Sequence, residues 1–178
     1  MSTQPARQND TLLLVAEWMT LLLMLLVGIA MIALAIAGIV LFLDRTNQFA
    51  EPAAQAAMSV AGFAALVVLG MAGGLVLLML GIRFLQTMLE IIRSVGKGDP
   101  FVSANAARLR AMAWLLLAIQ LGGLALGIYG QWLGKFSDSI HIKSDFSMSG
   151  LVGVLALFVL ARVFAHGTAM RRDLEGTV

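Results

Sequence analysis

Four long apolar stretches, separated by shorter polar segments, dominate the hydrophobic pattern of this chain. All four are uncharged, and the last is the shortest: residues 18–43, 52–82, 111–134 and 146–161. About 20 helical residues are needed to cross the ~30 Å hydrocarbon core of a bilayer. Arg162 follows the fourth stretch, and its aliphatic stem can lie in lipid while the guanidinium reaches the headgroups. We therefore extend this last span to about His166.

These stretches predict transmembrane helices, because a helix satisfies its own backbone hydrogen bonds in lipid and an open strand does not. We place the helices at about residues 12–43, 56–95, 104–134 and 147–167. The connections 44–55 and 135–145 are short, so the first and second helices form one antiparallel hairpin and the third and fourth form another. The predicted fold is all-α: an integral membrane, antiparallel four-helix bundle forming a single transmembrane domain over residues 1–178.

The composition excludes several other classes of protein. Apolar residues make up 60% of the chain and charged residues 12%, against roughly 45–50% and a quarter in soluble domains. So little charge cannot cover a soluble domain of this kind, and a disordered chain has the opposite bias. There are no cysteines, which excludes disulfides, thiolate metal sites and thiol redox chemistry. With 12 Lys and Arg against 10 Asp and Glu, we expect no direct binding of nucleic acid.

Basic residues in the connections predict the orientation. The two termini and the second connection together carry nine of them: Arg7, Arg83, Arg93, Lys97, Arg108, Arg110, Arg162, Arg171 and Arg172. The first and third connections carry three: Arg45, Lys135 and Lys143. Because cytoplasmic loops are enriched in Lys and Arg, both termini and the second connection are predicted to face the cytoplasm.

The connection between the second and third helices begins with a helical pattern of polar and apolar positions. The polar positions are Arg83, Gln86, Thr87, Glu90, Arg93 and Ser94. Apolar residues fill the opposite face, which predicts an amphipathic cytoplasmic extension of the second helix. This extension should end near Gly96, because glycines favour helix termination and Pro100 restricts the residue before it. Ser103 or Asn105 offers a side-chain oxygen to cap the third helix.

Several short segments resemble a known family. They are residues 98–101, Asn105 and residues 108–110 around the start of the third helix, residues 146–149, and residues 160–164, Gly167, 170–171, 173–175 and 177–178. Together they resemble the domain-of-unknown-function 2975 family. The resemblance implies a bacterial four-helix inner-membrane protein. It also suggests a regulatory role, since members are often encoded beside a small helix-turn-helix regulator. It supplies no activity and no catalytic residue.

The sequence offers little for catalysis or for a metal. The predicted topology places His141 and His166 on opposite sides of the membrane, so they cannot share a haem or metal. No acid, base or nucleophile clusters at a recognisable spacing. Glu17 lies at the predicted cytoplasmic edge, where we expect it to pair with Arg110 or Arg162; proton coupling is the less favoured role. We therefore predict no enzyme activity, no cofactor, and no catalytic or metal-binding residue.

The resulting hypothesis is a non-enzymatic regulatory protein of the bacterial inner membrane, whose cytoplasmic face binds a soluble partner such as a small helix-turn-helix transcriptional regulator. The predicted partner-binding residues are Arg83, Arg93, Lys97, Pro100, Phe101, Asn105, Arg108, Arg110, Arg162, Arg171 and Arg172. Arginine suits such contacts because its planar fork pairs with carboxylates. The same charges could instead only set the topology, or attract anionic lipid.

Two further possibilities concern assembly and transport. Glycines at four-residue spacing, at positions 70 and 74, 123 and 127, and 130 and 134, let helices approach closely. They serve either packing within the bundle or a homo-oligomer. The alternative function is a small transporter or channel, working as an oligomer because four helices enclose little space. Few charges lie within the spans, which disfavours it.

Overall fold

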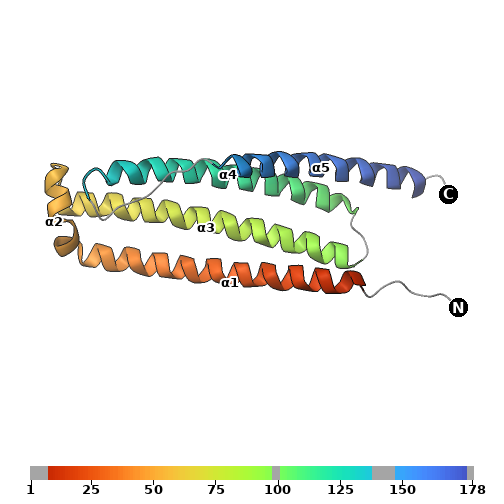
Figure 1. Ribbon diagram of the computed structural model, residues 1–178, viewed down its shortest axis with the longest axis horizontal. Coiled ribbons are helices and arrows are strands. Elements are labelled where there is room, and N and C mark those ends of the chain that lie inside the picture. The colour runs from red at the N-terminus through yellow and green to blue at the C-terminus, as the bar shows by residue number, and fades with distance from the viewer. Residues whose placement is uncertain (1–7, 98–100, 138–146, 176–178) are drawn as a thin grey trace. The chain divides into compact units, whose positions relative to one another are not determined.

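Five helices make up the described part of the chain in the computed structural model (Figure 1). The structure describes residues 8–97, 101–137 and 147–175. The helices are α1 (Gln8–Leu43), α2 (Arg45–Gln55), α3 (Val60–Gly96), α4 (Ser103–Leu133) and α5 (Met148–Glu175). These ranges contain no strand. The all-α class predicted from the sequence is therefore confirmed.

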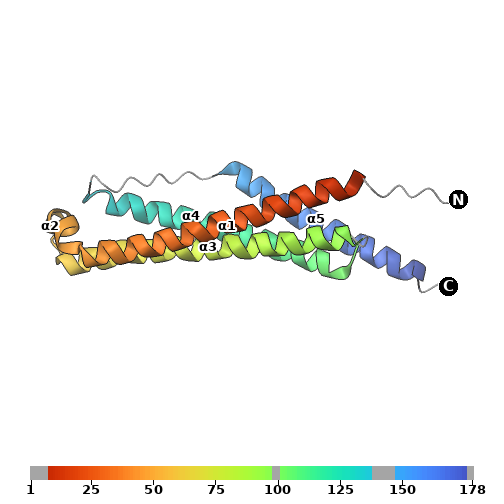
Figure 2. The same cartoon turned by 90° about the horizontal axis from the view of Figure 1, so that it is seen from below.

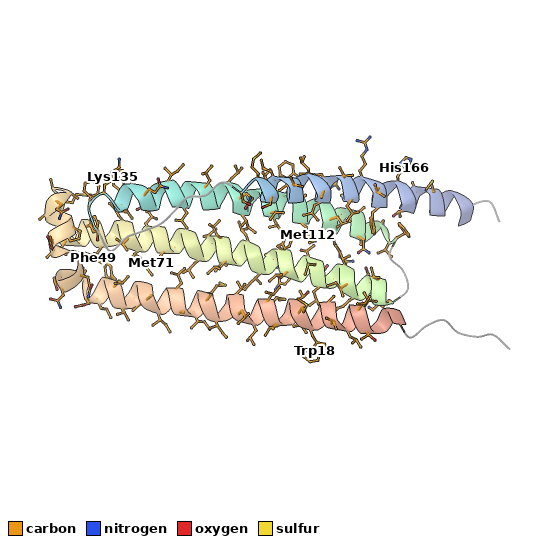
Figure 3. All side chains as sticks on the ribbon, viewed as in Figure 1. Trp18, Phe49, Met71, Met112, Lys135 and His166 are labelled. Carbon is orange, nitrogen blue, oxygen red and sulfur yellow. The ribbon has the colours of Figure 1, made fainter. Side chains whose placement is uncertain are left out.

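Four of these helices are long and apolar enough to cross a membrane, judged by length and composition. The candidate spans are Thr11–Leu43, Val60–Gly96, Ser103–Leu133 and Met148–Met170. They correspond to the four apolar stretches in the sequence. In α1 the most apolar part has no buried residue, and Trp18 projects away from the ribbon (Figure 3). Such a helix needs an apolar solvent or partner along much of its length.

The chain divides into two compact units, each built from parts of several helices. The first unit comprises residues 1–26, 82–117 and 149–178, so far as they are described. The second comprises residues 27–81 and 118–148, with the same restriction. Helices α1, α3 and α4 contribute to both units, whereas α5 lies almost wholly in the first.

The connection at residues 44–55, expected to be a short loop, contains helix α2. The Asp44 carboxylate accepts hydrogen bonds from Asn47 Nδ2 at 2.6 Å and Gln48 Nε2 at 3.1 Å, which orders the first turn. Phe49 and Ala53 follow one turn apart, and both are buried. The helix runs crosswise to the neighbouring ends of α1 and α3 (Figures 1 and 2). The loop prediction was wrong because the segment is short, mostly polar and contains Pro52, and only Phe49 and Ala53 within it are buried.

The core of the second unit lies where α2 meets α3 and α4. It comprises Phe49, Ala53, Phe63, Ala64 and Leu133. The rings of Phe49 and Phe63 pack with centroids 5.8 Å apart. Phe63 is fully buried, so the crosswise helix is held mainly by aromatic and methyl contacts.

Glycines allow α3 and α4 to approach closely within the second unit. The Tyr129 hydroxyl on α4 donates a hydrogen bond of 2.8 Å to the Leu66 carbonyl on α3. A Cβ added at Gly70 would lie 3.0 Å from the Tyr129 ring, and one at Gly122 would lie 2.5 Å from Leu77 Cδ2. Gly123, which the sequence offered as a packing position, has no described residue within 4 Å of an added Cβ.

Candidate functional site

The last turns of α3 carry polar side chains that contact two different helices of the first unit. On one side, Arg93 Nε donates to Glu17 Oε1 of α1 at 2.9 Å. The expectation that Glu17 pairs with Arg110 or Arg162 was wrong. Arg93 lies on the side of α3 that faces α1, whereas Arg110 and Arg162 line a groove between α4 and α5. Glu17 thus joins α1 to α3.

On its other side, α3 is joined to α4 by four residues that we call the Asn105 network: Glu90, Ser94, Asn105 and Arg108. Asn105 Nδ2 donates to Ser94 Oγ at 2.6 Å, and Ser94 Oγ donates to the Ile91 carbonyl at 2.8 Å. Arg108 donates from Nη1 to Asn105 Oδ1 at 2.9 Å and from Nε to Glu90 Oε2 at 2.8 Å.

Helical spacing explains how the Asn105 network assembles. Glu90 and Ser94 stand four residues apart on one face of α3, and Asn105 and Arg108 stand three apart on the facing side of α4. Asn105 is completely buried, and the structure satisfies its amide on both sides. A buried amide is stabilising only when its hydrogen bonds are made, so these four residues fix the register between the two helices.

The segment before α4 is tied to α5 through Phe101. The rings of Phe101 and Phe164 pack with centroids 5.3 Å apart. The single hydroxyl proton of Thr168 is shared between two carbonyl acceptors, that of Phe164 at 2.8 Å and that of Phe101 at 3.2 Å from Oγ1. A Cβ added at Gly167 would lie 3.1 Å from the Phe101 ring. We call this set the Phe101 contact; it brings together two segments that carried the family resemblance.

A groove of about 470 Å³ runs between α4 and α5, also in the first unit. We call it the Arg110–Arg162 groove. It is lined by Ser103, Ala106, Ala107 and Arg110 of α4 and by Phe158, Ala161, Arg162 and Ala165 of α5. Both arginines are exposed. Beside the groove, the rings of Trp114 and Phe158 meet edge to face at 5.4 Å.

The eleven residues predicted to bind a partner fall into three groups. Arg93 and Arg108 are engaged in ion pairs, and Asn105 is buried, so it can affect such a face only through the residues it holds. A second group is exposed: Arg83, Lys97, Phe101, Arg110 and Arg162. Pro100 lies outside the described residues, as do the side chains of Arg171 and Arg172, which belong to α5.

Three residues of this site make hydrogen bonds with Asn105, Arg108 and Phe101 that were not predicted from the sequence: Glu90, Ser94 and Thr168. A four-residue spacing of Glu90 and Ser94 opposite Asn105 and Arg108 is the signal that could have paired them. Within the described ranges, no three His, Cys, Asp or Glu side chains gather as a metal site would require.

Four apolar, span-length helices whose polar contacts from helix to helix each lie within a single unit are typical of small multi-pass membrane proteins. Residues 51–178 match the family described as protein of unknown function (DUF2975), and the chain belongs to this family. The match includes all of α3, α4 and α5, and hence the Asn105 network, the Phe101 contact and the groove, but not Glu17. No curated protein and no solved structure matches the chain.

Proposed function

We propose that this chain is a non-enzymatic, multi-pass protein of the bacterial inner membrane that binds a soluble regulatory protein at its cytoplasmic face. The membrane location is supported by four span-length apolar helices and by the exposure of their large side chains, such as Leu12, Trp18 and Val152. Lipid is the solvent that makes such exposure favourable.

In this proposal the four long helices form an antiparallel bundle, and the last turns of α3 extend beyond the apolar region as an amphipathic segment. Leu89 is buried on one side of these turns, whereas Arg83, Glu90 and Arg93 are exposed. Both termini and the α3–α4 connection would face the cytoplasm, as the bias of Lys and Arg favours.

The observation that carries the proposed partner binding is the division of the basic residues into two kinds. Arg93 and Arg108 are held by Glu17 and Glu90. Four others have no carboxylate within 4.0 Å among the described residues: Arg83, Lys97, Arg110 and Arg162. Unpaired, exposed cations favour an acidic partner, since complementary charges speed and orient association.

The partner proposed is the small helix-turn-helix protein that the family resemblance predicts to be encoded beside this chain. Lys97 is the sharpest position to test, because it is exposed and lies next to the α3–α4 connection. We expect Lys97→Glu to weaken co-purification of that regulator with the full-length membrane protein about tenfold or more. Lys135→Glu, at an exposed lysine in the opposite connection, is the matched control and should leave capture unchanged. Equal capture by all three proteins would contradict this docking face.

The orientation has an independent test, for which the chain is well suited because it contains no cysteine. Lys97→Cys and Lys135→Cys variants can be exposed to a membrane-impermeant maleimide in spheroplasts. Labelling of position 135 alone is the expected result. Labelling of position 97 from outside would place the α3–α4 connection away from any cytoplasmic regulator and end the proposal.

Transport is the weaker alternative on the present geometry. Two cavities of the second unit, about 450 and 550 Å³, are lined by apolar side chains and glycines, with Tyr129 as the one polar side chain. The Tyr129 hydroxyl is already bonded to the Leu66 carbonyl. Neither cavity therefore offers the polar pathway that a solute or ion would need.

A further inference from the structure

The Arg110–Arg162 groove combines two positive charges with a lining that is apolar apart from Ser103. Of its eight lining residues, four are alanines and one is Phe158, and the two arginines come from different helices. Neither guanidinium has a carboxylate within 4.0 Å in the part of the chain that the structure describes. Arg93 and Arg108 of the same unit differ in this respect, because both have such a partner.

Both arginines lie within candidate membrane spans, where a charge without a nearby carboxylate is costly. Arg110 lies within the candidate span Ser103–Leu133, and Arg162 within Met148–Met170. A charged side chain in or near hydrocarbon is costly unless an opposite charge or the headgroup layer accompanies it. The groove therefore calls for an anion supplied from outside the described chain.

The surroundings of the groove favour an anion that carries an apolar tail. One turn beyond Arg110 on α4 stands Trp114, which is 59% exposed. On the same face of α5 as Arg162, two turns back, stands Leu155, which is 64% exposed. The contact between Trp114 and Phe158 shows that both helices continue from the groove into this apolar surface in the same direction. Polar binding groups and an apolar track thus adjoin each other.

We propose that the Arg110–Arg162 groove binds the phosphate of an anionic membrane lipid, with the acyl chains lying along the apolar surface beside Trp114 and Leu155. Arginine suits this role because its planar fork can donate two parallel hydrogen bonds to phosphate oxygens. The alanines matter because they leave the guanidinium groups room to reach a common ligand. This inference rests on the proposed membrane location but not on the proposed regulator.

The test measures lipid retained by the purified full-length protein, without any soluble partner. The probe is phosphatidylglycerol against phosphatidylcholine in mixed micelles, and retained lipid is counted by native mass spectrometry. We expect a preference for phosphatidylglycerol that falls about fivefold for Arg110→Gln or Arg162→Gln and about thirtyfold for the double variant. Arg83→Gln is the matched control, since Arg83 is an exposed, unpaired arginine outside the groove.

A lysine double variant and a check of folding separate specific lipid binding from general charge and from misfolding. Arg110→Lys with Arg162→Lys retains the charge but loses the fork, so it should keep part of the preference, and the helical content of each variant is checked by circular dichroism. An equal loss in Arg83→Gln would mean general attraction to an anionic surface and would overturn the site. Displacement of the lipid by inorganic phosphate at equal concentration would overturn the lipid as the source of the phosphate. Unchanged retention by the double variant would overturn the proposal altogether.

Failure here is distinguishable from failure of the proposed function. Lys97→Glu should weaken regulator capture about tenfold or more and leave lipid retention unchanged, because Lys97 does not line the groove. The double glutamine variant should show the loss of lipid in detergent, where no regulator is present.

Discussion

Asn105 Nδ2 lies 2.6 Å from Ser94 Oγ, and this hydrogen bond joins the start of α4 to the end of α3. The two residues are 11 positions apart in the chain, and Asn105 has no exposed surface. Asn105 therefore acts first as a structural residue of this family-matched segment. Any effect of this residue on partner binding would come through the helices that it holds in register.

The first prediction follows from that burial. Asn105→Ala should lower the free energy of unfolding by about 1–3 kcal/mol, because Ser94 and Arg108 each lose a buried hydrogen-bond partner. Denaturant titration of the protein in detergent micelles measures the change. Leu121→Ala, at a 54% exposed position of the same helix, is the control and should alter stability little. A stability loss no larger than that of the control would remove Asn105 from its structural role.

The second prediction concerns the ion pair between α1 and α3. The Glu17 and Arg93 side chains keep 30% and 54% of their surface exposed, so solvent screens their attraction. A double-mutant cycle with Glu17→Gln and Arg93→Gln should give a coupling of about 0.2–1 kcal/mol, typical of exposed pairs. The coupling should shrink when salt is raised. A coupling of several kcal/mol, insensitive to salt, would show that the pair is more deeply desolvated than its exposure indicates.

The third prediction uses two neighbouring glycines of α4 that have different surroundings. A Cβ at Gly122 would lie 2.5 Å from Leu77 Cδ2, whereas one at Gly123 meets nothing within 4 Å. Gly122→Ala should be less favourable than Gly123→Ala by about 1 kcal/mol, because the end of the Leu77 side chain must move to make room for the new Cβ. Gly123→Ala should be neutral or slightly stabilising, since alanine is the better helix former. If Gly123→Ala instead disrupted a dimer seen by crosslinking, Gly123 would mark a contact between copies.

The fourth prediction tests how α2 is held. Phe63→Ala should cost about 3 kcal/mol or more, because the fully buried ring packs against Phe49 and its removal leaves a cavity. Leu69→Ala is the control on the same helix, since Leu69 is 62% exposed and leaves no cavity. Thermal unfolding monitored by circular dichroism compares the two. Similar costs for both would mean that Phe63 is not the residue that anchors the crosswise helix.

The strongest sequence signal was apolar length, and it placed the four long helices well, because crossing lipid requires an uninterrupted run that few other structures need. Helix α2 was missed because its segment is short and mostly polar, and the burial of Phe49 and Ala53 depends on Phe63, which comes later in the chain. The partner of Glu17 was misassigned for a similar reason: Arg93, Arg110 and Arg162 are equivalent by charge, and only the rotation of α3 toward α1 selects Arg93. Patterns along one helix predict its faces, but not which neighbour each face meets.

Thr168 has a consequence that reaches beyond its own helix. Its hydroxyl binds the backbone of Phe101, and Gly167 leaves space for the ring of the same residue. A slide of α5 by one residue, about 1.5 Å, would carry the hydroxyl away from its acceptor and turn a different side chain toward the ring. The position of α5 along its own axis is thus coupled to the backbone conformation at Phe101. A force that shifts α5 would also change how the chain enters α4.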